Sequence, residues 1–277
     1  MPRGPAAFAV HHGECFPDGD ALVLATSDSR MRINPLAMRR VDVWIGAETA
    51  RSPVAFSRLL FYATQAALRQ CGLYELHAAA VRPPAPPDDV RADGVLIVGA
   101  SGSGKTTLAM RLTAAGWSNV SDDVVLIRDD APAAEAFAFR RVFAATETTL
   151  NALPTPRLEE ATREPNELEP SKRRLDPDVL FPGSFAPSCT PRALVFPAMT
   201  GRARSETQPM AASDALTRLL KMCPWASYDR AVAGPHLSAL ARLARQAASY
   251  TLLAGTDLLH DAGAAPRLFA PLAAGSP

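Results

Sequence analysis

The first part of the chain alternates short apolar runs with polar residues. The runs cover residues 21–25, 31–33 and 41–45, and Asp, Ser, Asn and Pro separate them. Apolar runs of this length between turn-forming residues are typical of short β-strands. We therefore expect a small β-rich region at the start of the chain.

A helical period follows this region. Ser52 and Pro53 make a good helix start, because a serine side chain caps the first free N–H groups and proline fits the first turn. Gly72 ends the pattern. The apolar residues at helical spacing between these points are Phe56, Leu59, Leu60, Ala63 and Ala67. The pattern predicts a helix that packs this face into a core.

Two further apolar runs are separated by a polar loop. Tyr74 to Val81 and Gly94 to Val98 read as strands, and residues 82–93 between them are rich in Pro and Asp. Strands joined in this way are expected to pair as a hairpin. The first strand carries His77 among alanines, where a histidine is either a core residue that hydrogen bonds the backbone or part of a site.

The second strand runs directly into the sequence G-x-x-x-x-G-K-T and then into a helical pattern. This is the context that a P-loop, or Walker A motif, requires. In a P-loop, the backbone N–H groups would cradle a phosphate at the helix N-terminus, Lys105 would reach the β- and γ-phosphates, and the Thr106 hydroxyl would bind Mg²⁺. The nucleotide-binding candidates are Gly99, Ala100, Ser101, Gly102, Ser103, Gly104, Lys105, Thr106 and Thr107.

The alternative to a P-loop is a Gly/Ser turn with a lysine on the surface. Lys and Arg together number 29, and only three of them are lysines. One of the three stands where a compact point charge suits a phosphate group, whereas arginine serves almost everywhere else. This usage favours the phosphate site.

An Asp pair interrupts the apolar run after the P-loop helix. That helix is expected to end at Gly116, and Asp122 and Asp123 stand inside the strand-like run 119–127. A buried carboxylate needs hydrogen-bond donors, a metal ion or the mouth of a site. The pair is therefore either a surface turn or the catalytic, metal-binding end of a strand, where ligands bind in α/β sheets.

The sequence loses its periodicity between residues 129 and 183. A strand is expected around 137–143, and the stretch 151–184, rich in Pro, Glu and Arg, is interpreted as a mobile flap. The flap carries the basic run Lys172, Arg173 and Arg174. This run is either a clamp for phosphate or an acidic substrate group, or a solvated surface.

The last third of the chain returns to regular patterns. A strand is expected at 192–196, helices at 213–222 and 235–248, and a final strand at 250–253. The Ala/Pro-rich tail from Asp261 is expected to be loosely held.

Composition limits the class of protein. The chain has 277 residues, 48% of them hydrophobic, and a formal net charge of +1, so bulk charge gives no reason to expect nucleic acid or a membrane surface as partner. Four scattered cysteines without C-x-x-C and the lack of a signal-like start predict a cytoplasmic protein. We expect two regions, 1–72 and 73–277.

The histidine strand, the P-loop and the Asp pair together resemble the catalytic domain of the HPr kinase/phosphorylase family. The resemblance is closer to the small related kinases, including those of lasso-peptide gene clusters. It covers somewhat over half of the chain, with weaker matches at 191–197 and 250–257. The P-loop alone is shared by many families, whereas a histidine-bearing strand before it and an Asp pair after it are more selective.

The resemblance implies an α/β fold, with a P-loop core built on a mixed sheet and flanking helices, behind a small β-rich N-terminal region. It also implies a kinase that uses ATP and Mg²⁺ to phosphorylate a serine or threonine hydroxyl of a peptide or small protein. Asp122 would be the base, Lys105 and His77 would support the chemistry, and Asp123 and Thr106 would hold the metal. The absence of the family's acidic signature after the Asp pair argues against HPr itself as substrate.

Other interpretations stay open. A small-molecule hydroxyl kinase fits the same residues, and so does an ATPase or nucleotide-binding regulatory module in which water is the acceptor. ATP is preferred only through the resemblance, so GTP is also open, as are a homo-oligomer and the reverse phosphorylase reaction. A DNA-stimulated motor is disfavoured, because no basic stripe with interleaved aromatic residues is present.

Overall fold

The computed structural model describes residues 4–10, 13–84, 93–128, 132–153, 157–163, 170–223 and 225–275. By its internal contacts the chain divides into two compact units. The N-terminal unit contains Met1–Tyr74 and Cys223–Ser238, and the core unit contains Glu75–Met222 and Ala239–Pro277. The chain first passes from the N-terminal unit to the core unit after Tyr74, close to the expected boundary at 72. The return of residues 223–238 to the N-terminal unit is not apparent in the sequence pattern.

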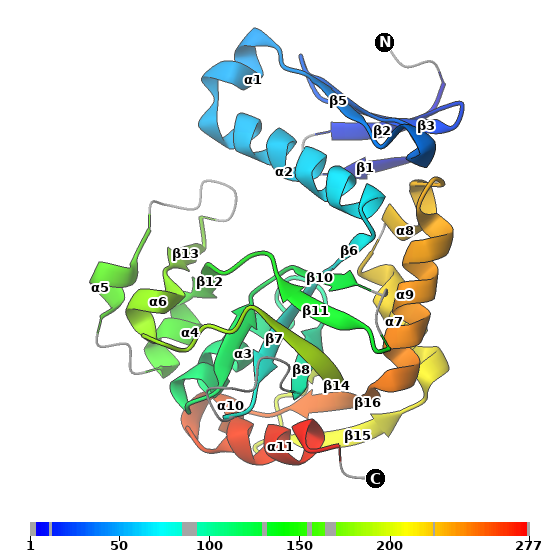
Figure 1. The fold of residues 1–277 in the computed structure, drawn as a ribbon. Coiled ribbons are helices and arrows are strands. Elements are labelled where there is room, and N and C mark those ends of the chain that lie inside the picture. Colours follow the sequence, from blue (N-terminus) through cyan, green and yellow to red (C-terminus); the bar gives the residue numbers. More distant parts are fainter. Residues whose placement is uncertain are drawn as a thin grey trace. The chain divides into compact units, whose positions relative to one another are not determined.

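The N-terminal unit is built on a five-stranded antiparallel sheet whose strands follow chain order (Figure 1). Its strands are β1 (Phe8–Val10), β2 (Gly13–Asp18), β3 (Ala21–Ala25), β4 (Arg30–Ile33) and β5 (Val41–Trp44). Its helices include η1 (Leu36–Met38), α1 (Ala47–Arg51), α2 (Pro53–Gln70) and α8 (Trp225–Tyr228). The three strands expected from the apolar runs are confirmed as β3, β4 and β5.

Helix α2 begins as its sequence predicts, with the Ser52 side chain accepting a hydrogen bond from the Ala55 N–H at 3.3 Å. Its buried face matches the predicted one at Leu59 and Ala63 and differs elsewhere. Leu60 is 41% exposed, and Ala67 is also exposed. The face that packs against the sheet and the returning segment contains Leu59, Tyr62, Ala63, Ala66 and the polar residues Gln65, Arg69 and Gln70. Burial of polar groups requires partners, and segment 223–238 supplies one of them from far along the chain.

The core unit contains a mixed sheet of nine strands in which most neighbours are antiparallel. The strands are β6 (Leu73–Leu76), β7 (Ala78–Arg82), β8 (Asp93–Val98), β9 (Ser118–Ser121), β10 (Val125–Arg128), β11 (Glu135–Ala138), β14 (Ser188–Met199), β15 (Glu206–Met210) and β16 (Ala248–Ala254). The order is β6-β10-β11-β14-β8-β7-β9, and β16 pairs with β14 and β15. The mixed α/β class expected from the sequence is confirmed, and so is the β7–β8 hairpin.

Strand β14 runs parallel to both β8 and β16. The carboxyl ends of parallel strands meet at one edge of a sheet, so the segments that follow β8, β14 and β16 are brought to the same edge. This edge positions the candidate site.

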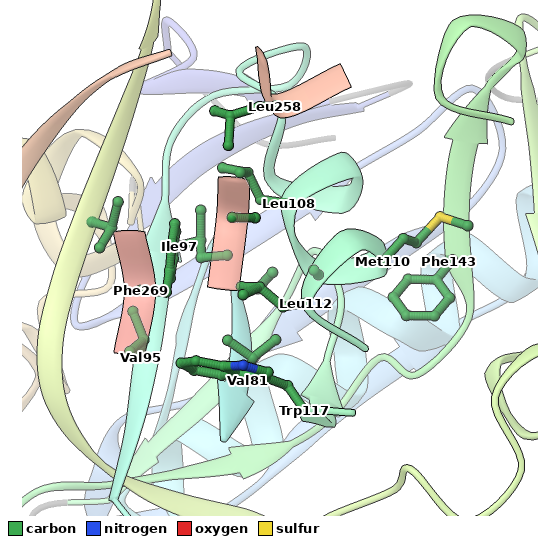
Figure 2. Packing of buried hydrophobic residues seen from close by; sticks show 14 of the residues in the cluster. Val81, Val95, Ile97, Leu108, Met110, Leu112, Trp117, Phe143, Leu258 and Phe269 are labelled. Carbon is green, nitrogen blue, oxygen red and sulfur yellow. The ribbon is translucent and has the colours of Figure 1, made fainter. Parts of the chain in front are cut away.

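Helices α3 (Lys105–Ala114) and α11 (Ala264–Ala273) contribute to the main apolar core, which they build together with β8 and β14. Figure 2 shows Leu108 and Leu112 of α3 pointing toward Ile97 of β8, while Met110 points to Phe143 on the other side of the helix. The rings of Trp117 and Phe269 meet edge to face at 6.4 Å.

Helix α11 corrects the expectation of a loosely held tail. Ala264, Phe269 and Leu272 of this helix are buried in the core. The tail's many alanines suit a helix that packs closely, because Ala has the highest helix propensity and little side-chain volume. Composition alone did not separate this helix from an unstructured tail.

The segment expected to be a flap has regular structure in its described part. It contains α4 (Glu147–Ala152), α5 (Leu158–Ala161), α6 (Pro177–Leu180) and β13 (Lys172–Leu175), which pairs with β12 (Phe143–Thr146). Leu175 and Leu180 are buried in the core. Residues 154–156 and 164–169 of this segment lie outside the described residues, and the flap's movement stays a prediction.

The strand expected around 137–143 is instead divided between β11 and β12, because residues 139–142 belong to no strand. The elements expected in the last third of the chain are confirmed, and the strand at 192–196 lies within β14. The helices at 213–222 and 235–248 correspond to α7 (Ala212–Lys221) and α9 (Ala233–Gln246), and the last strand to β16. The edge strand β15 and the short α10 (Asp257–His260) carry no clear sequence pattern. In the described parts of the chain no helix is long and apolar enough to cross a bilayer, and all four cysteines are free thiols.

Two expected strands are interrupted, and both interruptions fall on predicted site residues. The run 74–81 breaks at His77 into β6 and β7, and the run 119–127 breaks at Asp122 and Asp123 into β9 and β10. These interruptions turn the polar residues out of the sheet at its edge.

Candidate active site

The glycine-rich loop (residues 99–104) joins β8 to the first turn of α3. Gly102 and Gly104 have φ angles of 82° and 92°, a backbone region that residues with a side chain rarely adopt. A Cβ atom on Gly99 would lie 2.6 Å from the Ser103 hydroxyl oxygen. The loop therefore needs these glycines in order to fold back on itself at the start of the helix.

Lys105 is the first residue of α3, and its side chain lies along the loop. Its ammonium donates to the carbonyl oxygens of Gly99 at 2.7 Å and Ala100 at 3.0 Å. The same nitrogen lies 3.1 Å from Nε2 of His77, and the lysine is only 5% exposed. A buried positive charge is thus held at the loop.

Thr106 is paired with Asp122. The threonine hydroxyl lies 3.1 Å and 3.0 Å from the two carboxylate oxygens, and the Ala144 N–H donates to one of them at 3.3 Å. Asp122 has no exposed surface. Burial raises the pKa of its carboxyl to about 6, and the negative charge of Asp123 adds to the effect.

Asp123 occupies a strained backbone position. Its φ angle is 71°, and the Val124 N–H donates to the Asp122 carbonyl at 2.9 Å across it, which is the hydrogen bond of a γ-turn. This turn is rare for residues with a side chain and stores strain that the surroundings must hold. It directs the two neighbouring carboxylates to different surroundings.

The Asp123 carboxylate lies between two basic side chains. One oxygen accepts from the Arg140 guanidinium at 2.6 Å, and the other lies 3.3 Å from Nδ1 of His77. Burial lowers the pKa of His77, and the charge of Lys105 lowers it further while Asp123 opposes both. Because the lysine can only donate, a neutral His77 accepts at Nε2 and donates from Nδ1 to Asp123. Arg140, Asp123, His77 and Lys105 thus form one continuous chain of contacts.

The Ser121 side chain holds the segment that carries Arg140 next to the Asp pair. Its buried hydroxyl lies 2.6 Å from the Val124 carbonyl and 2.7 Å from the Arg140 carbonyl, and it accepts from the Arg140 N–H at 3.0 Å. The Asp122 N–H also donates to the Arg140 carbonyl at 2.7 Å. The turn of the Asp pair is therefore tied to the segment that carries Arg140. Sequence reasoning missed this arginine, and the only available signal was a basic pair after an apolar run.

The three basic residues of the predicted clamp lie on strand β13, and neighbouring side chains of a strand point to opposite faces. Lys172 donates to the Ser101 hydroxyl of the glycine-rich loop at 3.1 Å. Arg173 instead contacts Glu147 at 2.8 Å and, more weakly, Glu159 at 3.7 Å. Alternation along β13 puts Arg174 on the same side as Lys172, and its buried Nε atom has no hydrogen-bond partner.

The Thr107 side chain contacts helix α4. Its hydroxyl shares a hydrogen bond of 2.7 Å with the buried Thr149 hydroxyl at helix α4. This side chain anchors α3 to α4, and the contribution of Thr107 to nucleotide binding stays a prediction.

The residues present fit a magnesium ion that takes only one or two of its ligands from the protein. Within the described parts of the chain, no group of three or more His, Cys, Asp or Glu side chains is arranged to hold a metal. Mg²⁺ does not require such a group in phosphate sites, since it binds one or two protein oxygens and takes the remainder from phosphates and water. Thr106 and Asp122 offer two hard oxygen donors side by side.

The similarity of this chain to known proteins is found among solved structures. No protein-family model matches the chain, and no curated protein matches it. Among solved structures, the HPr(Ser) kinase/phosphatase from Coxiella burnetii is similar over 49% of this chain and 72% of that chain, with 14% sequence identity and a TM-score of 0.28.

Proposed function

We propose that the protein is a kinase that transfers the γ-phosphate of a nucleoside triphosphate, preferably ATP with Mg²⁺, to a serine or threonine hydroxyl of a peptide or small protein. The observation that carries the proposal is the gathering of Lys105, Thr106, both aspartates and His77 around one glycine-rich loop. Phosphoryl transfer requires mainly positioning and charge neutralisation, and these residues supply both.

The loop and α3 are suited to hold the phosphates. The free N–H groups at the helix N-terminus attract negative charge, and the glycines allow a phosphate to approach the backbone. Lys105 has three donors, which now contact two carbonyl groups and His77. On binding, phosphate oxygens replace part of these contacts at little cost, because the lysine is already held in place.

Thr106 and Asp122 are suited to hold the metal. Their oxygens are adjacent, and Asp122 is fully buried beside the threonine. A cation there would offset the cost of burying the carboxylate, which is the cause of its raised pKa. When bound, Mg²⁺ neutralises charge on the β- and γ-phosphate oxygens.

Asp123 is the carboxylate suited to meet the acceptor. Its side chain is 30% exposed, whereas Asp122 has no exposed surface. The sequence assigned the base to Asp122 and the metal to Asp123, and these surroundings support the reverse assignment. The acceptor oxygen attacks the γ-phosphorus while the bond to the β–γ bridging oxygen breaks, and its proton passes to Asp123. His77 and Arg140 orient this carboxylate.

The acceptor is proposed to bind beside Lys172 and Arg174, which lie on the loop side of β13. Positive charge there is suited to an acidic or phosphate-bearing group. A precursor peptide of the lasso type is one candidate acceptor, through the resemblance of the His, P-loop and Asp motifs to small kinases of that kind.

The test is incubation of the purified protein with γ-labelled ATP, Mg²⁺ and serine-containing candidate peptides. Label is expected on the peptide at one serine, and it should disappear when that serine becomes alanine. Lys105→Ala should abolish the Mg·ATP-induced rise in melting temperature, whereas Lys221→Ala, at an exposed lysine on α7, should not change it. Label found only in free phosphate would identify an ATPase instead. An unchanged thermal shift in Lys105→Ala would overturn the nucleotide site.

A further inference from the structure

Beyond the phosphate-binding residues, the edge of the core sheet carries an exposed apolar side chain next to the glycine-rich loop. Met199, the last residue of β14, is 61% exposed. Its sulfur lies 3.7 Å from the position that a Cβ on Gly104 would take. Covering a large exposed apolar side chain with a ligand is favourable, because apolar surface is removed from water.

The sheet order separates this methionine from the reacting groups. Strand β8, which leads into the loop, lies between β14 on one side and β7 on the other, with β9 beyond β7. His77 directly precedes β7 and Asp122 directly follows β9, so the reacting groups lie at the β7–β9 side. Met199 lies at the β14 side. A triphosphate whose last phosphate points to the reacting groups therefore extends its other end toward Met199.

The segment after Met199 is held firmly in place. The Thr200 N–H donates to the Ala254 carbonyl at 3.0 Å, and the Thr256 N–H donates to the Arg202 carbonyl at 2.8 Å. Ser205 donates to the Asp257 carboxylate through both its N–H at 3.0 Å and its hydroxyl at 2.5 Å. A surface that is already ordered loses little conformational entropy when a ligand binds.

Gly255 permits this close packing. A Cβ atom there would lie 2.7 Å from the Arg204 carbonyl carbon and 2.8 Å from the Arg202 carbonyl oxygen. The segment 200–205 thus rests directly on the start of α10. It also carries two exposed arginines, Arg204 and Arg202, and the Arg202 guanidinium lies 3.7 Å from the Glu206 carboxylate.

We infer that Met199 and the segment 200–205 form the nucleoside subsite, in which the methionine side chain packs against the base or ribose. The inference rests on the proposed function, because the subsite has meaning only if the glycine-rich loop holds the triphosphate. Thioether sulfur packs favourably on flat π-systems, and a base has such a face whichever nucleotide is bound. Met199 then contributes to affinity for the nucleoside, and phosphate binding does not depend on it.

The experiment compares binding of ATP, GTP and inorganic tripolyphosphate, each with Mg²⁺, by calorimetry. The wild-type protein should bind ATP or GTP more tightly than tripolyphosphate. Met199→Ala should weaken binding of the preferred nucleotide about 3- to 10-fold, the effect expected of one such packing contact, and leave tripolyphosphate binding unchanged. Met199→Leu should recover part of the loss. Met38→Ala, at a methionine of the N-terminal unit that is 56% exposed, serves as the matched control and should have no effect.

The outcomes separate the two proposals. A wild-type protein that binds none of the three compounds would overturn the proposed function and this inference with it. Normal tripolyphosphate binding together with unchanged nucleotide affinity in Met199→Ala would overturn the nucleoside subsite alone. Equal weakening of tripolyphosphate and nucleotide would assign Met199 to the shape of the loop and would likewise overturn the subsite.

Discussion

Each of the two units buries a charged carboxylate, and the two carboxylates are stabilised in different ways. In the N-terminal unit, Asp229 is paired with Arg69 at 3.1 Å, both side chains are almost fully buried, and the guanidinium stacks on the Trp225 ring at 4.6 Å. In the core unit, Asp122 accepts hydrogen bonds from a hydroxyl and an amide, both neutral. The first charge is balanced by a buried guanidinium, whereas the second has no direct ion pair among the described residues and lies beside the negative charge of Asp123. This difference separates a structural carboxylate from a candidate site.

The largest expected effect concerns Asp123, which lies next to Asp122 and reaches solvent. Asp123→Asn should keep the fold and Mg·ATP binding, because the amide is nearly isosteric. Phosphoryl transfer should fall by roughly two to four orders of magnitude, since the acceptor proton loses its base. The measurement is the transfer rate at saturating ATP. A fully active Asp123→Asn, or a variant that fails to bind Mg·ATP, would contradict the role proposed for this residue.

Removing the paired carboxylate of Asp229 should lower the stability of the protein and leave its activity unchanged. Asp229→Ala leaves the Arg69 charge buried without its carboxylate, and breaking such a pair costs about 3–5 kcal/mol of unfolding free energy. Chemical denaturation measures the loss, and Asp20→Ala, at an exposed turn residue, is the control. Below the unfolding transition, the turnover number should be unchanged. A variant that is stable but inactive would place Asp229 among the functional residues.

Replacing Asp122 should raise the unfolding free energy, whereas replacing Asp229 should lower it. The pKa of Asp122 in the folded protein is raised from 3.8 to about 6, so the folded state binds the proton more tightly than the unfolded state. The contribution of Asp122 to the unfolding free energy therefore falls as pH rises from about 4 to 6, by up to about 3 kcal/mol. Asp122→Asn has no such proton, and its advantage over the wild type should grow across this range and stay constant above it.

The same two proteins, wild type and Asp122→Asn, should also differ in how strongly Mg·ATP stabilises them. Mg²⁺ with ATP should stabilise the wild type and stabilise Asp122→Asn much less, because the amide is a poorer ligand for Mg²⁺. Thermal unfolding between pH 4 and 8, with and without Mg·ATP, measures both effects. A wild type whose stability rises between pH 4 and 6 relative to the variant would show that Asp122 is balanced within the fold, as Asp229 is.

The smallest expected effect distinguishes the two faces of β13. Lys172→Ala should raise KM for the acceptor or for ATP about 3- to 10-fold, the effect of one partly exposed charge-assisted hydrogen bond. Arg173→Ala, whose contacts are with Glu147 and Glu159, should leave both KM values unchanged. Steady-state kinetics on the two variants measure this difference. Equal effects would mean that the basic run acts only through its total charge.

Much of the candidate site could be predicted from the sequence, because its motifs are local. Gly102, Gly104 and Lys105 stand within one short stretch, and the strand before them and the helix after them are visible as apolar patterns. The Asp pair and His77 were detectable as polar residues inside strand-like runs. Arg140 was not, because its role depends on the Ser121 hydroxyl that ties two distant segments together.

The fold shows the same limit. Helix α2 was predicted with its cap and its end, and its buried face was right in part: Leu59 and Ala63 are covered, whereas Leu60 and Ala67 are exposed. Arg69 joins this face because it meets Asp229 only after the chain returns to the N-terminal unit. Helix α11 was missed because its alanines gave no period to detect. An apolar pattern reports that a face is buried somewhere, and it does not report which distant segment covers that face.

The sequence by itself determined the glycine-rich loop, the elements on either side of it and the chemical types gathered near it, since φ preferences, helix starts and apolar periods act over a few residues. The tertiary structure decided which of these residues meet. The contacts of His77 with Lys105 and Asp123, of Thr106 with Asp122 and of Lys172 with Ser101 each join separate elements. It also decided which aspartate is buried and which reaches solvent, because a γ-turn directs neighbouring side chains to different surroundings. Residue type sets what a group can do, and burial and partners set which of those roles it takes.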